Sequence, residues 1–365
     1  MLKNGERLLE KTVPKVSILV INYNGKKWLH QCLRSISTIS YPNFDTYLID
    51  NASTDGSIEY VKENFPFVAI IKFDTNIGFA KGYNNAINQI KTDYILLLNN
   101  DTKILKPDFL DIIVSQAQKD FDIAAIVCKM VFMSDPSVIN SVGGIGIPYW
   151  RGFEDIGFKE KDVGQYDVPP IEAFSFCGGA TLIRSKAFIE TKGFDETFFA
   201  FFEDTDLSWR FRLKKLKIKY VPDAKIAHHY SGTYSEGPNK TYLCKRNLFR
   251  SILKNCGSTT IYWAIRNYLL FTILASISYL RVEHAPLMAC ALFKSILWNL
   301  WHLPSTYNKR QIIQNERKTS DEEILFRMYP LKLIKRREID SFGDRIGERI
   351  FGYFPKKSCC KKVTQ

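Results

Sequence analysis

The sequence predicts an α/β protein with a doubly wound sheet and helices on both faces. Short apolar runs of strand length alternate with helix-spaced apolar residues along the first third of the chain, and this alternation is typical of parallel β-α-β units. Four of the apolar runs end in polar, turn-forming residues. Because the carboxyl ends of parallel strands share one edge of a sheet, these polar ends are expected to surround one ligand.

The individual elements follow from the spacing of the apolar residues. Short continuous apolar runs are typical of buried strands, and apolar residues three or four apart are typical of helices. Strands are therefore expected at 16–21, 47–49, 68–73, 94–98, 123–131, 174–183 and 220–227. Helices are expected at 28–36, from 57 onward, at 78–90 and after 107. Residues 132–172 are rich in Gly and Pro and are expected to form loops over the site.

Composition and charge exclude several classes of protein. The 365 residues allow one large domain or two ordinary ones. A content of 45% hydrophobic and 24% charged residues excludes a globally disordered chain. The net charge of +13 favours anionic partners such as sugar nucleotides or phospholipids. No zinc-finger, RNP or basic-zipper sequence occurs, so nucleic acid is not an expected partner. The sequence leaves the oligomeric state open.

The cysteines and the N-terminus indicate a reduced, cytosolic setting. The eight cysteines include no CxxC pair, which argues against structural zinc and against a thioredoxin-like site. The first 15 residues lack a long apolar core, so they are not expected to act as a signal peptide.

The tripeptide Asn99-Asn100-Asp101 is the most informative strand end. It closes the apolar run 94–98, so its side chains are expected at the ligand-binding edge of the sheet. Hard oxygen ligands at this place suit Mg²⁺ or Mn²⁺ that bridges a diphosphate. A simple turn at the strand end is the alternative, because Asn and Asp are common turn formers.

The other strand ends are expected to bind a donor nucleotide. These residues are Asn22, Tyr23, Asn24, Asp50, Asn51 and Asn76. Asp50 can accept a hydrogen bond from a pyrimidine or from a ribose hydroxyl. Asn76 precedes a predicted helix whose free N–H groups favour anions. Lys81 on that helix can assist, although a single helical lysine is usually just solvated.

An acidic cluster is the second strong signal. Glu203, Asp204 and Asp206 lie within four residues, and mutual repulsion raises the proton affinity of such a group when it is partly buried. This prepares a general base, for which Asp204 is the candidate, whereas Asp206 suits a helix start. Contacts to the sugar or acceptor are expected from Glu203, Trp209 and the pair Gly178 and Gly179. The glycine pair allows either a close approach of the ligand or a β-bulge.

Two histidines are candidate metal or diphosphate ligands. His228 and His229 end the predicted strand 220–227, in a chain with only five histidines. Imidazole suits Mn²⁺ better than Mg²⁺. The alternative is a histidine in the core or at the surface whose hydrogen bonds are made within the protein or to water.

The C-terminal third has a different character. Residues 261–280 and 285–303 are apolar and flanked by basic clusters, and each run approaches the roughly 20 residues that span a bilayer. Arg266 and Lys294 argue against simple deep spans, so interfacial helices are as plausible as a hairpin, and a buried helical pair is the third option. The expected division is a leader (1–13), a catalytic domain (14–240), an apolar membrane-associated segment (241–305) and a basic C-terminal region (306–365).

Seven segments together resemble family 2 glycosyltransferases of the GT-A fold, in particular the rhamnosyltransferase-like branch. They read NYNG, IDNASTDGS, NIGFAKGYNNAI, LLLNNDT, CGGATLIR, GFDETFFAFFEDTDLSWR and HH, and they lie within residues 14–255. The resemblance implies a doubly wound mixed sheet. It implies inverting transfer of a sugar, first of all rhamnose from dTDP-rhamnose, to a lipid-linked glycan in surface polysaccharide synthesis. The expected location is the cytoplasmic face of the cell membrane.

The resemblance also implies roles for single residues. Asp50 matches the position that holds the base, and Asp204 matches the catalytic base. Asn99-Asn100-Asp101 stands at the DXD position with Asp101 as the metal ligand. Asn in place of the first Asp weakens the expected metal affinity. The histidine pair matches a metal or diphosphate contact, and His228 is the preferred member.

Two other classes of protein fit the sequence less well. A dinucleotide-dependent oxidoreductase is disfavoured because no GxGxxG follows the first strand, and the glycines at 143–146 run into Pro148 instead of a helix. A non-catalytic membrane-surface adaptor with a degenerate sugar-nucleotide site remains the alternative, which the intact set of carboxylates disfavours.

Overall fold

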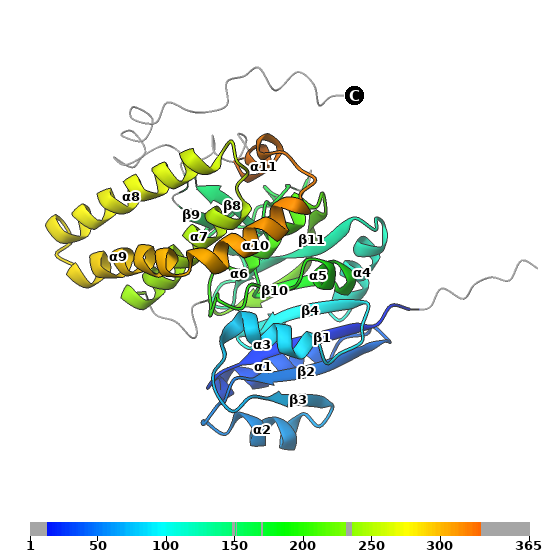
Figure 1. Ribbon diagram of the computed structural model, residues 1–365. Coiled ribbons are helices and arrows are strands. Elements are labelled where there is room, and N and C mark those ends of the chain that lie inside the picture. The colour runs from blue at the N-terminus through cyan, green and yellow to red at the C-terminus, as the bar shows by residue number, and fades with distance from the viewer. Residues whose placement is uncertain (1–12, 148–149, 151, 169–170, 231–235, 330–365) are drawn as a thin grey trace, which may run out of the picture.

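The structure is a computed structural model that describes residues 13–147, 150, 152–168, 171–230 and 236–329 (Figure 1). Its strands are β1 (Val16–Asn22), β2 (Phe44–Asp50), β3 (Val68–Lys72), β4 (Tyr94–Asn99), β5 (Thr102–Ile104), β6 (Ile123–Phe132), β7 (Ile139–Ser141), β8 (Gly144–Ile147), β9 (Gly152–Asp155), β10 (Ala180–Arg184) and β11 (Lys217–His228). Its helices are α1 (Lys26–Ile36), α2 (Ser57–Asn64), α3 (Gly78–Ile87), α4 (Phe109–Gln118), α5 (Ser185–Glu190), α6 (Glu203–Leu213), α7 (Pro238–Asn255), α8 (Ile261–Arg281), α9 (Pro286–Trp301), α10 (Leu303–Asn315) and α11 (Asp321–Met328).

The described strands form one mixed sheet and one small hairpin. The sheet runs in the order β3-β2-β1-β4-β10-β6-β11-β5, with β7 paired to β6, while β8 and β9 form a separate two-stranded sheet. β1 lies between β2 and β4 and is parallel to both, and β2 is parallel to β3. The carboxyl ends of β1 to β4 therefore share one edge, which confirms the expectation from their polar ends.

β10 makes the sheet mixed, because it runs antiparallel to both β4 and β6. The predicted strand 174–183 begins only at Ala180. Residues 178 and 179 instead form a turn, and the N–H of Asn99 donates to the carbonyl of Gly179 at 2.9 Å. Since β10 is antiparallel, its amino end meets the carboxyl end of β4, and this brings the glycine pair to the ligand-binding edge.

Helices cover both faces of the sheet. Alternate side chains of each strand point to opposite faces. In β1, Ile18 packs with α1, α2 and α4 on one face, and Leu19 packs with α3, α5 and α6 on the other. The predicted doubly wound arrangement is therefore confirmed. The region 132–172, expected to be loops, also holds β7, β8 and β9.

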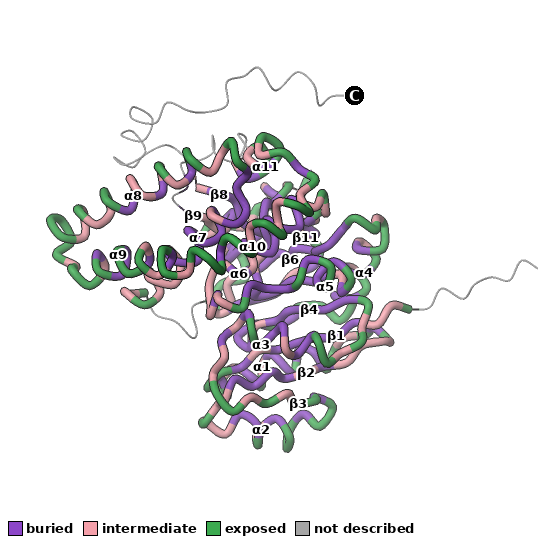
Figure 2. The backbone as a smooth tube through the Cα atoms, in the orientation of Figure 1, coloured by how far each residue is buried: buried purple, intermediate pink, exposed green. Residues whose placement is uncertain are grey.

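The C-terminal helices extend from one end of this sheet (Figure 1). α7 packs on α6 through an apolar cluster that includes Trp209, Phe249 and Tyr268. The expected domain boundary at residue 240 thus falls inside α7. α8 and α9 form a hairpin that projects beyond the other helices, and much of its surface is exposed or half-buried (Figure 2).

The two apolar stretches differ in length. Among the described residues, α8, with 21 residues, is the single helix long and apolar enough to cross a membrane. α9 ends after 16 residues, because Leu303 and Pro304 begin α10. The expectation that both stretches approach bilayer length is therefore wrong for the second one. The leader up to residue 12 and the basic tail from 330 lie outside the described residues.

Candidate active site

A cavity of about 470 Å³ opens at the carboxyl edge of β1 to β4. It collects most of the residues that the sequence singles out, although they come from distant parts of the chain. The predicted residues that line it are Asn22, Tyr23, Asn51, Asn76, Asn99, Asn100, Asp101, Gly178, Gly179, Glu203, Asp204 and His228.

Side-chain amides join the strand ends beneath this cavity. Asn100 Nδ2 donates to Asn22 Oδ1 at 2.6 Å, and Asn22 Nδ2 donates to Asp50 Oδ1 at 3.2 Å and to Ser53 Oγ at 3.0 Å. A Cβ atom at Gly25 would lie 2.0 Å from Asn100 Nδ2, so only glycine permits this approach. Asp50 is 0% exposed and does not line the cavity. Asp50 stabilises the loop after β2 and does not face the cavity.

Asp101 and His228 form a buried pair at one wall of the cavity. Asp101 Oδ1 lies 3.2 Å from His228 Nε2, and Asn140 Oδ1 fixes the ring from the other side, 2.9 Å from His228 Nδ1. Burial alone would raise the pKa of Asp101, but the hydrogen bond and charge of His228 hold it below the ordinary value. Asp101 is therefore ionised at neutral pH.

This pair fits a divalent metal ion. The carboxylate of Asp101 and the imidazole of His228 would together supply two ligands to such an ion at the cavity wall. The described residues include no cluster of three or more His, Cys, Asp or Glu that could hold a metal. The remaining ligands of an ion would therefore be diphosphate oxygens and water, as Mg²⁺ prefers.

The neighbouring histidine has a different environment. The His229 ring contacts Trp28 with ring centroids 4.2 Å apart and ring planes tilted by 37°, and the backbone N–H of His229 donates to the carbonyl of Asp101 at 3.0 Å. It does not line the cavity. The two histidines therefore differ, because β11 ends at His228, which lines the cavity, and His229 follows the strand.

The three clustered carboxyl groups occupy three different environments at the start of α6. Glu203 is buried, and its Oε2 has no hydrogen-bond partner among the described residues. Burial, and then the charge of Asp204, raise the pKa of Glu203 well above its ordinary value. Asp206 is fully buried and bonds to Arg210 Nε at 2.9 Å and to Lys254 Nζ. Glu203 and Asp204 both line the cavity, whereas Asp206 does not.

The carboxylate of Asp204 is held by backbone donors. Its Oδ2 accepts from the N–H of Gly178 at 2.9 Å, and its Oδ1 accepts from the N–H of Thr205 at 2.6 Å. A Cβ atom at Gly178 would lie 2.9 Å from the Phe79 ring and 3.6 Å from Asp204 Cβ. Burial raises the pKa of Asp204 despite these hydrogen bonds, which act in the opposite direction.

Three further predicted contacts lie outside the cavity. Asn24 is exposed with φ +50° and caps the loop after β2, where its Oδ1 accepts from Thr54 N at 2.8 Å. Lys81 is exposed on α3 and does not line the cavity. Trp209 is 1% exposed and stacks on Trp150 with centroids 5.7 Å apart. The expectation that Trp209 contacts the sugar is wrong, because α6 turns this side chain into the apolar contact with α7.

Sequence reasoning missed one acidic pair in the cavity wall. Glu154 and Asp155 on β9 line the cavity, within a region expected only to form loops. Asp155 Oδ1 accepts from Ser141 Oγ at 2.6 Å. Burial raises the pKa of Asp155 to about 6; Ser141 opposes this shift, and the charge of Asp204 adds to it. Alternation within Gly152–Asp155 is too short to be recognised as a strand, so no sequence signal identified these residues.

Comparison with known families assigns this fold. Residues 17–191 match the family model Glycosyl transferase family 2. This chain carries a family 2 glycosyltransferase domain. Residues 166–233, which include Asp204 and His228, match a second model, described as the N-terminal domain of galactosyltransferase. The first of these matches agrees with the resemblance in the motifs of the chain.

Curated relatives are similar in sequence to about 60% of this chain. The O-antigen biosynthesis protein RfbC of Myxococcus xanthus is 27% identical over 228 residues, which are 60% of this chain and 18% of RfbC. The N-acetylglucosaminyl-diphospho-decaprenol L-rhamnosyltransferase of Mycobacterium tuberculosis is 24% identical over 244 residues, which are 60% of this chain and 78% of that enzyme.

Solved structures show the same architecture. The mannosyltransferase PcManGT from Pyrobaculum calidifontis, in complex with GDP-Man and Mn²⁺, superposes with a TM-score of 0.52 and 16% identity over 80% of this chain and 88% of that chain. S. aureus TarS 1–349 in complex with UDP-GlcNAc gives a TM-score of 0.52 and 18% identity over 77% of this chain and 80% of that chain. At these identities the likeness establishes the fold, which is GT-A.

Proposed function

We propose that this glycosyltransferase moves a sugar, with inversion, from a nucleoside-diphosphate sugar to a hydroxyl of a lipid-linked glycan. Rhamnose from dTDP-rhamnose is the first candidate donor, because a curated relative is named an L-rhamnosyltransferase that acts on a decaprenol-linked sugar. The observation that carries the proposal is that Asp101 and Asp204, about 100 residues apart in sequence, line one cavity.

The donor nucleotide is proposed to bind at the ends of β1, β2 and β4. Amides of Asn22, Asn51 and Asn99 line this part of the cavity and can bond to the nucleoside and diphosphate. Asp101 and His228 are the residues that would hold Mg²⁺ or Mn²⁺. A bound divalent ion would neutralise the leaving diphosphate, which is worth several kcal/mol.

Asp204 is proposed to act as the general base. The acceptor hydroxyl gives its proton to the Asp204 carboxylate while its oxygen bonds to the anomeric carbon. The bond from that carbon to the diphosphate breaks on the opposite face, so the configuration inverts. The raised pKa of Asp204 brings its proton affinity closer to neutral pH, and a positioned base contributes about 10²–10⁴-fold.

A lipid-linked acceptor would place this reaction at the cytoplasmic face of the membrane. The projecting hairpin of α8 and α9 exposes large apolar side chains, among them Trp263, Leu280 and Trp301. Arg266, Arg281 and Lys294 lie on the same hairpin. Aromatic and basic residues together suit the interface of an anionic membrane.

The decisive experiment compares sugar transfer and donor binding in Asp204→Asn. The candidate donors are first ranked by the rise in Tm that each produces, because a true ligand stabilises the folded enzyme by mass action. The variant is expected to lose at least about 10²-fold in kcat and to keep the donor Kd, because the amide cannot accept the proton.

The control variant is Asp101→Ala. It should weaken donor binding as well as turnover, and added Mn²⁺ should no longer raise the Tm of the donor complex. Full transfer activity in Asp204→Asn would exclude Asp204 as the base. A wild-type chain that binds donors but neither transfers nor hydrolyses them would contradict the proposed function.

A further inference from the structure

Asn247 is a buried amide of α7 that contacts residues 195–202, the segment that leads into α6. Its side chain is 0% exposed. Nδ2 donates to the carbonyls of Ala200 at 2.9 Å and Phe201 at 2.7 Å, and Oδ1 accepts from Arg246 Nε at 2.8 Å. Both hydrogens of the amide are therefore used on this one segment, which is the full donor capacity of an Asn side chain.

The segment has a backbone conformation that needs such support. Phe201 and Phe202 are consecutive residues with φ of +69° and +68°. Bulky residues rarely adopt this left-handed region, and they stay there only where the surroundings hold them. Phe202 is the N-cap of α6, directly before Glu203 and Asp204. These two left-handed residues therefore set where the carboxylate of Asp204 lies.

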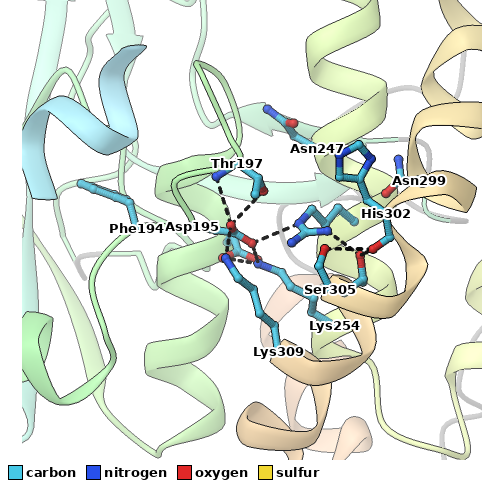
Figure 3. Close-up of polar contacts among 12 residues, drawn as sticks. Phe194, Asp195, Thr197, Asn247, Lys254, Asn299, His302, Ser305 and Lys309 are labelled. Atoms are coloured by element: carbon cyan, nitrogen blue, oxygen red, sulfur yellow. Dashed lines mark hydrogen bonds and ion pairs between the residues drawn. The ribbon is translucent and has the colours of Figure 1, made fainter. Parts of the chain in front are cut away.

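A second group of contacts ties α7 to the beginning of the same segment (Figure 3). Asp195 accepts from Thr197 N at 3.2 Å and from Lys254 Nζ at 2.6 Å. Arg246 Nη2 donates to the carbonyl of Thr197 at 3.0 Å. α7 therefore holds the segment at both ends, from outside the region that the two family models match.

We propose that Asn247 is a positioning residue for sugar transfer. It fixes the Phe201–Phe202 turn, so that Asp204 keeps its hydrogen bond to Gly178 and faces the acceptor hydroxyl. The proposal rests on the proposed role of Asp204 as the base. It makes α7 part of the catalytic machinery, although this helix follows the glycosyltransferase domain in the sequence.

Two substitutions at this position test the proposal. Asn247→Leu removes the amide at similar volume, and Asn247→Asp keeps the shape and the contact to Arg246 but replaces the two donor hydrogens by an oxygen. We expect kcat to fall by about 10- to 100-fold in both, because a displacement of about 1 Å can cost about 10²-fold. The donor KM should stay close to the wild-type value, since the proposed donor contacts come from β1, β2 and β4.

Asn299→Leu is the matched control. Asn299 on α9 is also 0% exposed, and its Nδ2 donates to the carbonyls of Arg246 at 3.0 Å and Ser295 at 2.9 Å. Neither of these two hydrogen bonds reaches the segment before α6. We expect this variant to lose a similar amount of Tm and to keep the wild-type kcat. It therefore separates positioning from a general loss of stability.

Three outcomes decide the matter. A fall in kcat at constant donor KM in the Asn247 variants alone supports the proposal, and Asn247→Asp carries the test if Asn247→Leu does not fold. Wild-type kcat in a folded Asn247 variant, or an equal fall in Asn299→Leu, overturns it. A wild-type chain without transfer activity would instead contradict the proposed function and is recognised before any variant is made.

Discussion

Carboxyl groups a few ångströms apart have pKa values shifted in different directions in this glycosyltransferase because their immediate partners differ. Asp206 has cationic partners, and the pKa of this group lies below its ordinary value although burial acts against this. Burial, and then the charge of Asp204, raise the pKa of Glu203 well above its ordinary value. The pKa of Asp204 is also raised by burial, and this residue faces the cavity. One short acidic sequence thus supplies a structural anion, a carboxyl group with a strongly raised pKa and a candidate base.

The pH dependence of transfer should report the carboxyl groups of the cavity. Burial raises the pKa of Asp155 to about 6, and Ser141, Asp204, His228 and its neighbour Glu154 modify this shift. A raised pKa means that the group takes up its proton as the pH falls through about 6. We therefore expect kcat/KM to fall as the pH is lowered through about 6, because Asp155 then loses its charge.

Asp155→Asn tests this assignment. The variant should lack the step near pH 6 but still lose activity in acid, because Asp204 must be ionised to accept a proton. The measurement is kcat/KM from pH 4.5 to 8.5 for wild type and variant under identical metal concentration. A step near pH 6 that persists unchanged in Asp155→Asn would show that another group is responsible.

At the scale of elements, a buried charge cluster joins the GT-A domain to the C-terminal helices. Lys254 of α7 lies 2.6 Å from Asp195 Oδ2 and 3.0 Å from Asp206 Oδ1, and all three side chains are at most 3% exposed. Arg250 and Lys309 also pair with Asp195. These cations hold the pKa of Asp195 well below its ordinary value, although burial acts in the opposite direction. The cluster connects α6, α7 and α10.

Lys254→Met should be strongly destabilising. It leaves two buried carboxylates short of a cation, and breaking a buried pair in this way costs about 3–5 kcal/mol. The measurement is the free energy of unfolding in urea. Lys186→Met is the control, because its pair with Glu190 is exposed at 3.8 Å and should contribute at most about 0.5 kcal/mol. Equal stability of the two variants would contradict this account of the cluster.

At the scale of the whole molecule, the projecting hairpin distinguishes one end of the protein from the rest. α8 is apolar, yet only Ala264, Tyr268 and Thr272 of its 21 residues are buried in the described structure. A helix with this composition is normally covered, by protein or by lipid. The neighbouring α7 carries Asn247 and Lys254, so the element beside this apolar surface also contacts the catalytic segment.

Binding to vesicles should depend on this hairpin. The full chain is expected to sediment with anionic vesicles and to bind neutral ones less well, because basic residues near the surface contribute about 1 kcal/mol each. The double substitution Trp263→Ser and Leu280→Ser removes two side chains that are more than half exposed. Each should weaken binding by roughly tenfold, since burial of such a side chain is worth about 1.5–3 kcal/mol.

Phe121→Ser provides the control for the vesicle experiment. Phe121 is 87% exposed but lies between α4 and β6, away from the hairpin in sequence and on the sheet. Its loss should leave vesicle binding unchanged. A chain that ignores anionic vesicles, or a control that loses as much binding as the hairpin variant, would contradict a membrane contact through α8.

Local pattern was sufficient for most of the sheet and for part of the site. The apolar runs of β1 and β4 can be recognised in the sequence because buried parallel strands need apolar side chains on both faces. The polar residues after them can be recognised because the ends of these strands meet at one edge. Asp204 could be recognised in the same way, because it lies in a short cluster of carboxyl groups at the start of α6. These features depend on short stretches of chain, which a sequence displays directly.

The sequence by itself therefore determined the α/β class, the ligand-binding edge and the candidates Asp101, His228 and Asp204. Only the tertiary structure decided that Trp209 is covered by α7, that His229 turns away from the cavity and that Asp155 enters it. It also decided that Asn247 contacts the segment before α6. The physical reason is that burial and hydrogen bonding of a side chain depend on the elements packed against it, and these come from distant parts of the chain.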